Sequence, residues 1–159
     1  MNEIQFWTNH VKRALHSQHH HRVAWKVGTS TRAGILDICY RNEHGEVAWL
    51  ELKRIPEWPA RDTTPIHIDI SIEQHAHLRE WCEGDRGHGF VLLSIETQVI
   101  LFPWYVHNTV EQDNIPDLEL AGWERHKDIW TSLAPTLNSM MGGQAHKIKD
   151  AFILEVTEE

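Results

Sequence analysis

Two strand-like runs, residues 35–41 and 47–53, flank a short polar connection, and this hairpin constrains the fold more than any other feature of the chain. Both runs consist mostly of apolar residues, and the connection at 42–46 contains a glycine, which is typical of a hairpin with a five-residue loop. If the loop is centred on His44, Asp37 lies directly opposite Glu51. We expect the Cβ atoms of such a pair to lie about 4.5–5.5 Å apart.

The remaining pattern predicts an α/β domain with a central mixed sheet flanked by helices. The expected elements are, in order, a helix over 2–16, strands over 22–27, 35–41 and 47–53, a helix over 71–83, and strands over 89–96 and 98–102. A polar loop is expected at 28–34 and a proline-containing irregular segment at 54–70. Further on, we expect a helix over 118–130, a loop over 138–144 and a strand over 151–156.

Charge is unevenly distributed along the 159 residues, whose net charge is −8. Residues 110–159 hold 10 acidic against 4 basic residues, so we divide the chain into a core, 1–109, and an acidic C-terminal extension, 110–159. This extension is expected to pack on, or to be appended to, the same domain. The acidic balance excludes a protein that coats nucleic acid by bulk charge, so any contact with a polyanion must come from a local patch.

Nothing in the sequence suggests a membrane protein. No run approaches the roughly 18 consecutive apolar residues of a membrane span, and no basic-then-apolar leader is present. The two cysteines, Cys39 and Cys82, have no metal-binding spacing and fit small core residues in a reducing compartment. We therefore expect a cytoplasmic protein with no membrane partner.

The facing pair Asp37 and Glu51 is the strongest chemical signal. Two carboxylates on a half-buried strand pair repel each other, and a divalent cation resolves that conflict. Carboxylate oxygens suit Mg²⁺ or Mn²⁺ better than Zn²⁺, and Lys53, on the same face of its strand, adds an ammonium group. Such a site is suited to polarising a phosphate and activating water. The alternative is that both acids are solvated residues of a surface strand.

Four motifs in a fixed order carry a family resemblance. They are Gly-Ile-Leu-Asp at 34–37, Trp-Leu-Glu-Leu-Lys-Arg at 49–54, Ser-Ile-Glu-Gln at 71–74, and a glycine followed by an apolar strand at 87–93. Over about residues 1–105 the chain resembles the PD-(D/E)XK, or restriction-endonuclease-like, nuclease superfamily. It is most similar to the VRR-NUC and Holliday-junction-resolvase branches, although Leu36 stands where proline is usual.

The resemblance implies a restriction-endonuclease-like core and a role for each matching residue. Asp37 and Glu51 would hold the metal together with the backbone carbonyl of Leu52. A helix glutamate near the N-terminus often joins the metal site in related resolvases, and Glu3 is the candidate for that role here. Lys53 would orient the attacking water or stabilise charge on the phosphate, and Gln74 would touch the water or the phosphate. Two alternatives stay open: Glu3 as an acid favouring the helix dipole, and Gln74 as the partner of Ser71 in a capping box.

Four further residues are predicted to contact DNA. Ser30 and Arg32 lie in the loop before Asp37, where hydroxyl and backbone donors could meet phosphate. Arg54 and Arg61 flank Trp58, a mixture of cations and an aromatic ring that suits unpaired or distorted DNA. The alternatives are an ordinary polar loop and a loop packed by its own aromatic residue.

Together these features predict a hydrolase: an Mg²⁺- or Mn²⁺-dependent endodeoxyribonuclease acting on branched or structured DNA, in the cytoplasm of a prokaryotic or phage-infected cell. Cleavage of a symmetric junction would suit a homodimer. One alternative is a catalytically inactive nuclease-fold module that binds DNA or a protein partner. Another is a structural or inhibitory phage-type protein.

Overall fold

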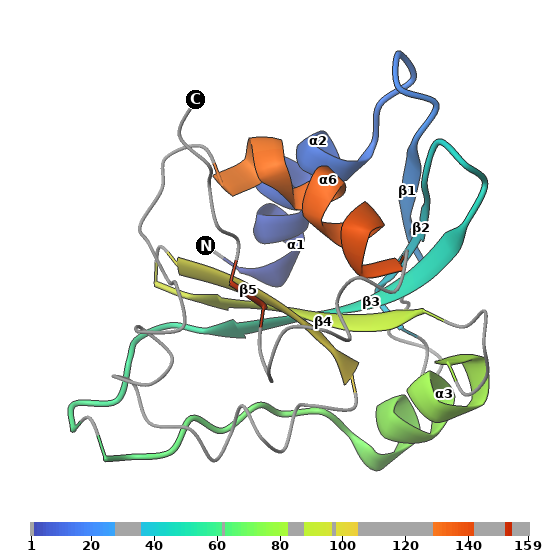
Figure 1. Ribbon diagram of the computed structural model, residues 1–159. Coiled ribbons are helices and arrows are strands. Elements are labelled where there is room, and N and C mark those ends of the chain that lie inside the picture. The colour runs from blue at the N-terminus through green and yellow to red at the C-terminus, as the bar shows by residue number, and fades with distance from the viewer. Residues whose placement is uncertain are drawn as a thin grey trace.

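A mixed β-sheet forms the centre of the computed structural model, which describes residues 2–27, 36–61, 63–82, 88–96, 98–104, 129–141 and 152–153 (Figure 1). The strands are β1 (Val23–Lys26), β2 (Ile38–Arg41), β3 (Val47–Ile55), β4 (Gly89–Ile95), β5 (Gln98–Pro103) and β6 (Phe152–Ile153), adjacent in that order. Strands β3 and β4 run parallel and the other neighbours antiparallel. The predicted α/β class with a central mixed sheet is therefore confirmed.

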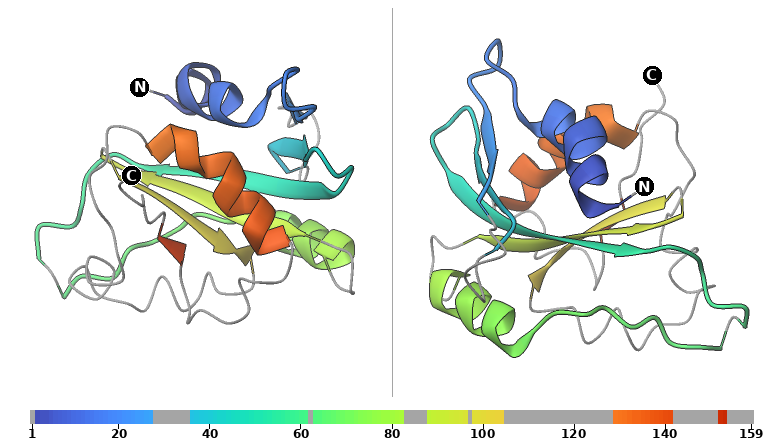
Figure 2. Two further views of the ribbon diagram at one scale, coloured as in Figure 1. Left: turned by 45° about the horizontal axis from the view of Figure 1, so that its top comes forward. Right: turned by 180° about the vertical axis from the view of Figure 1, so that it is seen from behind.

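Helices lie on both faces of the sheet. On one face are α1 (Glu3–Phe6), the π-helical turn η1 (Trp7–Val11), α2 (Lys12–Leu15) and α6 (Ile129–Met141). On the other lie α3 (Ile72–Cys82) and the irregular segment 56–71 (Figures 1 and 2). No helix among the described residues is long and apolar enough to cross a bilayer.

Each face of the sheet has its own apolar cluster. On the face that carries α1, η1, α2 and α6, Leu50 and Leu52 of β3 belong to a cluster with residues of all four helical segments. On the α3 face, Val91 and Leu93 of β4 pack with Ile66 of the irregular segment. Because successive strand residues point to opposite faces, β3 supplies the first cluster with its even-numbered residues and turns Glu51 and Lys53 toward the second.

Two residues of the β2–β3 connection, Asn42 and Gly45, account for its conformation. The Asn42 side chain is buried, and its Oδ1 accepts hydrogen bonds from the backbone N–H groups of His44 at 3.0 Å and Glu46 at 2.9 Å. Gly45 has φ +80°, a conformation that residues with a Cβ rarely adopt. The predicted hairpin with a connection at 42–46 is confirmed.

The sequence-based element boundaries hold in most of the described chain, with several differences. Strand β2 begins at Ile38 rather than at residue 35, because the Leu52 N–H donates to the Asp37 side chain instead of to a backbone carbonyl. Residue 35 and the predicted loop 28–34 lie outside the described residues. Strand β3 includes Arg54 and Ile55, which were expected to begin the irregular segment.

Of the helix expected over 118–130, residues 118–128 lie outside the described residues, and 129 and 130 begin α6. The expected loop at 138–144 is wrong for residues 138–141, which form the last turn of α6. Their apolar residues Met140 and Met141 are buried against the sheet, and this packing overrides the weak local signal.

The described part of the C-terminal extension belongs to the same hydrophobic core. Leu133 and Leu137 of α6 are fully buried beside Leu15 and Leu50, and β6 pairs with β5. A hydrogen bond of 2.8 Å from the Tyr40 hydroxyl to Asn138 Oδ1 ties α6 to β2. The division at residue 109 stays a prediction.

Replacing Leu137 with alanine tests whether α6 is integral to the domain. Loss of a fully buried leucine leaves a cavity, so we expect Leu137→Ala to lower the free energy of unfolding by about 2–5 kcal/mol. Ser139→Ala, at an exposed position of the same helix, should change it by less than about 0.5 kcal/mol. Urea denaturation measures both, and equal stabilities of the two variants would contradict the packing of α6.

Candidate active site

The site is built around the predicted register of the hairpin. Ile38 pairs with Leu50 and Cys39 with Trp49, which continues to Asp37 opposite Glu51, as expected. Asp37 itself lies one residue before β2. Its backbone oxygen accepts from Val27 N at 2.7 Å, and its Oδ2 accepts from Leu52 N at 2.8 Å. The Asp37 carboxylate is therefore fixed against the backbone of β3.

Glu51 is the most deeply buried acid of the site, with 1% of its surface exposed. Its Oε1 lies 3.1 Å from Lys53 Nζ and accepts a hydrogen bond from Gln74 Nε2. Its Oε2 is buried without a hydrogen-bond partner among the described residues. This burial excludes, for Glu51, the alternative of a solvated surface residue.

Gln74 caps its helix and also contacts the site, while its predicted contact with water or phosphate stays a prediction. Its backbone N–H donates to Ser71 Oγ at 3.1 Å, and its Oε1 accepts from Ser71 N at 3.0 Å, which is a capping box at the start of α3. The same Oε1 accepts from Lys53 Nζ at 3.3 Å, while Nε2 donates to Glu51. The N-terminus of α3 and the β3 side chains are thus joined by one amide group.

Lys26 is the site residue that sequence reasoning missed. Its Nζ lies 3.6 Å from Asp37 Oδ1 and 3.6 Å from Glu3 Oε1, so it links the start of α1 to the hairpin. Lys26 ends β1, and Val27 N–H bonds to Asp37 O, which places the two side chains together. The sequence predicted that Lys26 lies near the end of a strand. It did not predict the partner of Lys26, because the long connection 28–35 leaves the pairing of β1 with β2 undetermined by sequence alone.

Burial and like charge perturb the acids of this cluster. Burial, followed by the neighbouring Asp37 carboxylate, raises the pKa of Glu51 to about 7, although Lys53 acts in the opposite direction. The pKa of Glu3 is also raised, first by burial and then by Asp37. Carboxyl groups that are desolvated beside another carboxylate are characteristic of functional sites, and structural ion pairs produce the same shifts.

The chemistry of the donors fits a small cation that prefers oxygen. Glu51 Oε2 is a buried oxygen without a partner, and Asp37 is the next carboxylate in register. The Leu52 N–H faces Asp37, and the role of the Leu52 carbonyl as a metal ligand stays a prediction. In the part of the chain that the structure describes, however, no three His, Cys, Asp or Glu side chains are grouped closely enough to hold a metal ion.

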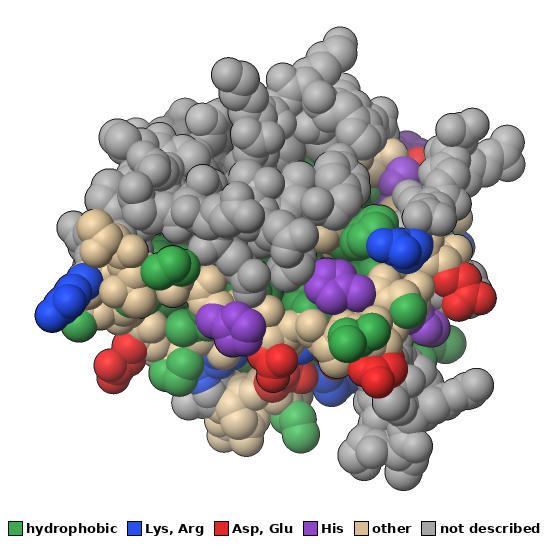
Figure 3. Space-filling model, turned by 90° about the horizontal axis from the view of Figure 1, so that it is seen from below, with side chains coloured by type: hydrophobic (Ala, Val, Ile, Leu, Met, Phe, Trp, Pro, Cys, Tyr) green, Lys and Arg blue, Asp and Glu red, His purple; other side chains and the backbone are tan. Residues whose placement is uncertain are grey.

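The predicted DNA-contacting residues are not gathered at this site. Ser30 and Arg32 lie outside the described residues. Arg54 is half-buried and follows Lys53 in β3, so it points to the opposite face of the sheet, and Arg61 is exposed in the irregular segment. On the described part of the α3 face, Lys and Arg side chains are separated by acidic, histidine and apolar ones (Figure 3). The DNA-binding roles of all four residues stay predictions.

Comparisons with known proteins add no relative. No family model, no curated protein and no solved structure matches the chain.

Glu51→Gln tests the cost of the buried carboxylate. Folding raises the pKa of Glu51 from about 4.5 to about 7, so the wild-type protein loses stability as the pH rises between these values, and the loss is complete above pH 7. Without metal, the variant should be more stable at pH 8, by on the order of 3 kcal/mol, and this gain should vanish near pH 4.5. Urea denaturation in EDTA at several pH values measures it.

The matched control is Glu57→Gln, which removes an acid from an exposed position of the irregular segment. It should leave the pH profile of stability unchanged. A Glu51→Gln variant that is less stable than the wild type at pH 8 would show that the contacts with Lys53 and Gln74 outweigh the cost of burial.

Proposed function

We propose that this chain is a metal-dependent DNA endonuclease with a restriction-endonuclease-like core, a hydrolase of phosphodiester bonds. The observation that carries the proposal is the buried Glu51 carboxylate, joined to Lys53 and Gln74 and in register with Asp37. All four residues come from the motifs on which the family resemblance rests. The preference for branched or structured DNA follows from that resemblance alone.

The order of elements supports the proposal. A helical segment precedes the antiparallel strands β1, β2 and β3, and α3 then connects β3 to β4, which runs parallel to β3. In this arrangement Asp37, one residue before β2, lies opposite Glu51 of β3, and Gln74 contacts Glu51 and Lys53 from α3. A strand-and-helix context of this kind gives the short Glu-x-Lys motif its specificity.

Each residue has a defined task in such a reaction. Asp37, Glu51 and the carbonyl of Leu52 would hold Mg²⁺ or Mn²⁺, which activates water and neutralises phosphate charge. The Lys53 ammonium would stabilise the negative charge that develops on the phosphate oxygens. Gln74 holds both Glu51 and Lys53 in place through its two amide atoms. Glu3 reaches the cluster through Lys26.

One observation favours the alternative, an inactive nuclease-fold module. The Lys26 ammonium lies beside Asp37 and the Lys53 ammonium beside Glu51, so each carboxylate already has a cationic partner within the chain. A site neutralised in this way can be stable without a metal ion. Binding of DNA or a protein partner without cleavage would then be the remaining activity.

Cleavage assays separate these two functions. Labelled linear duplex, flapped and four-way DNA should be cut in Mg²⁺ or Mn²⁺ and left intact in EDTA. Lys53→Met keeps the aliphatic stem but removes the charge, and we expect it to lower the rate by about 100-fold or more. Lys12→Met, at an exposed position of α2, should cut like the wild type. Near-wild-type cleavage by Lys53→Met would refute the assignment, and intact substrates throughout would favour the inactive module.

Metal-dependent melting tests the ligand set independently of cleavage. A cation that binds only the folded chain stabilises it by mass action, so millimolar Mg²⁺ or Mn²⁺ should raise the melting temperature of the wild-type protein. Glu51→Gln and Asp37→Asn should lose most of that rise, whereas Glu57→Gln should keep it. A wild-type melting temperature that is the same in metal and in EDTA would contradict a cation site at these residues.

A further inference from the structure

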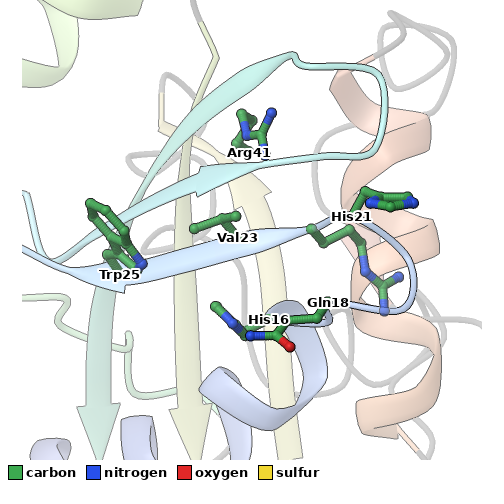
Figure 4. Close-up of a pocket in the computed structure, with 7 residues that line it drawn as sticks. His16, Gln18, His21, Val23, Trp25 and Arg41 are labelled. Carbon is green, nitrogen blue, oxygen red and sulfur yellow. The ribbon is translucent and has the colours of Figure 1, made fainter.

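A pocket of about 360 Å³ lies at the β1 edge of the sheet, and Glu51 is not among its lining residues (Figure 4). Its lining residues come from β1, the neighbouring β2 and the turn between α2 and β1. They are His16, Gln18, His21, Arg22, Val23, Trp25 and Arg41. Four of the seven are basic residue types and none is acidic, in a chain whose net charge is −8.

The cations of the pocket are available for an anionic ligand. Within the described part of the chain, neither Arg22 nor Arg41 forms an ion pair, and the buried Arg22 Nε has no hydrogen-bond partner. Arg41 is exposed. A backbone hydrogen bond is the main cause that lowers the pKa of Glu43, and the nearby Arg22 guanidinium contributes least. The Glu43 carboxylate oxygens accept from Asn138 Nδ2.

Trp25 gives the pocket an aromatic wall. Its side chain is 67% exposed, whereas Trp49, on the same face two strands away, packs edge-on with His77 of α3 at a centroid distance of 6.1 Å. Trp25 pairs with Cys39, which pairs with Trp49, so all three side chains project from the face that carries Glu51. The exposed ring therefore lies on the same face as the candidate active site.

The contacts at the β1 edge disfavour an extended peptide as the ligand of this pocket. An edge strand such as β1 can bind an extended peptide through its unpaired backbone groups. Here the backbone N–H of Ala24 donates to His16 Nδ1 at 3.3 Å, and Ser17 and Arg22 form their own two-residue bridge beside the strand. Because these contacts occupy backbone groups of the β1 edge, a ligand of the pocket would contact side chains and would not pair with β1 as an added strand.

From these contacts we propose that the pocket binds single-stranded DNA, with a base stacked on Trp25 and a phosphate held by Arg41, whose side chain projects from the same face. Stacking on an exposed aromatic ring beside cations is how proteins bind unpaired strands without reading their sequence. Arg41 lies four residues beyond Asp37, roughly 13 Å along the strand. The inference rests on the proposed function for its ligand: the pocket would hold the unpaired arm of a branched substrate while Glu51 and Lys53 act on a phosphate further along the same strand.

Fluorescence anisotropy with a labelled 12-nucleotide oligothymidylate in EDTA tests the site without cleavage. Trp25→Ala should weaken binding about fivefold or more, and Trp25→Phe, which keeps a ring, should bind within about twofold of the wild type. Arg41→Gln should reduce the slope of log affinity against log salt concentration by about 0.7, the value for one phosphate contact, while Trp25→Ala leaves the slope unchanged.

Two variants outside the pocket provide the controls. Ile72→Ala removes an apolar side chain that is 85% exposed on α3, and Arg13→Gln removes one exposed charge from α2. Both should bind the oligonucleotide like the wild type. Unchanged affinity of Trp25→Ala, or an equal loss in Ile72→Ala, would overturn the proposal. An Arg13→Gln slope reduced as much as that of Arg41→Gln would do the same, because the contact would then be unspecific charge attraction.

The two proposals can fail separately. Lys53→Met should lose cleavage yet bind the oligonucleotide normally in EDTA. A wild-type chain that cuts nothing but shows the Trp25 and Arg41 dependence refutes the nuclease and supports the single-strand site. A chain that cuts branched DNA with unchanged efficiency and affinity in Trp25→Ala refutes the single-strand site and supports the nuclease.

Discussion

Strand β3 is buried on both faces of the sheet, and the environment of the Glu51 carboxylate depends on that burial. Strand β3 pairs antiparallel with β2 on one side and parallel with β4 on the other, and both of its faces are covered by helices or by the irregular segment. Every side chain near its centre is therefore removed from water, including Glu51. Burying a leucine stabilises the fold, whereas burying a carboxylate costs free energy, so the presence of Glu51 there requires compensation.

That compensation is local, and it joins two parts of the chain. Lys53 offsets the charge from two residues further along β3, and the Gln74 amide reaches Glu51 from α3. Gln74 is also the residue that caps α3 together with Ser71, so the contacts that begin the helix also position the carboxylate. Distortion of the start of α3 would therefore displace Glu51. A change in the charge of Glu51 would alter its hydrogen bond with Gln74 at the start of α3.

The parts of this arrangement that depend on neighbours in sequence could be predicted. The two strand-like runs and the Asn42 to Glu46 connection sufficed for the register that pairs Asp37 with Glu51, and the Ser71–Gln74 spacing sufficed for the capping box. Lys26 could not be placed, because its contact with Asp37 depends on how β1 meets β2 across a long connection.

Helix α6 escaped prediction for a related reason. It carries Pro135 in its interior and no acidic residue in its first turn, so its local signals are poor. Its stability comes from Leu133 and Leu137 packing against the helices and sheet strands of the N-terminal part. Tertiary contacts over about 100 residues of sequence separation leave no pattern that a local reading can detect.

Charge balance connects the buried acid to the proposed chemistry. With all groups ionised, the carboxylates of Glu3, Asp37 and Glu51 face the two ammonium groups of Lys26 and Lys53, which leaves one unbalanced negative charge. A proton on Glu51 removes it, and this agrees with the raised pKa of that residue. With a divalent cation in place of the proton, the cluster would instead carry one positive charge. A phosphodiester carries one negative charge, so only the metal-loaded cluster would attract its substrate, and the metal-free cluster would be nearly neutral toward DNA.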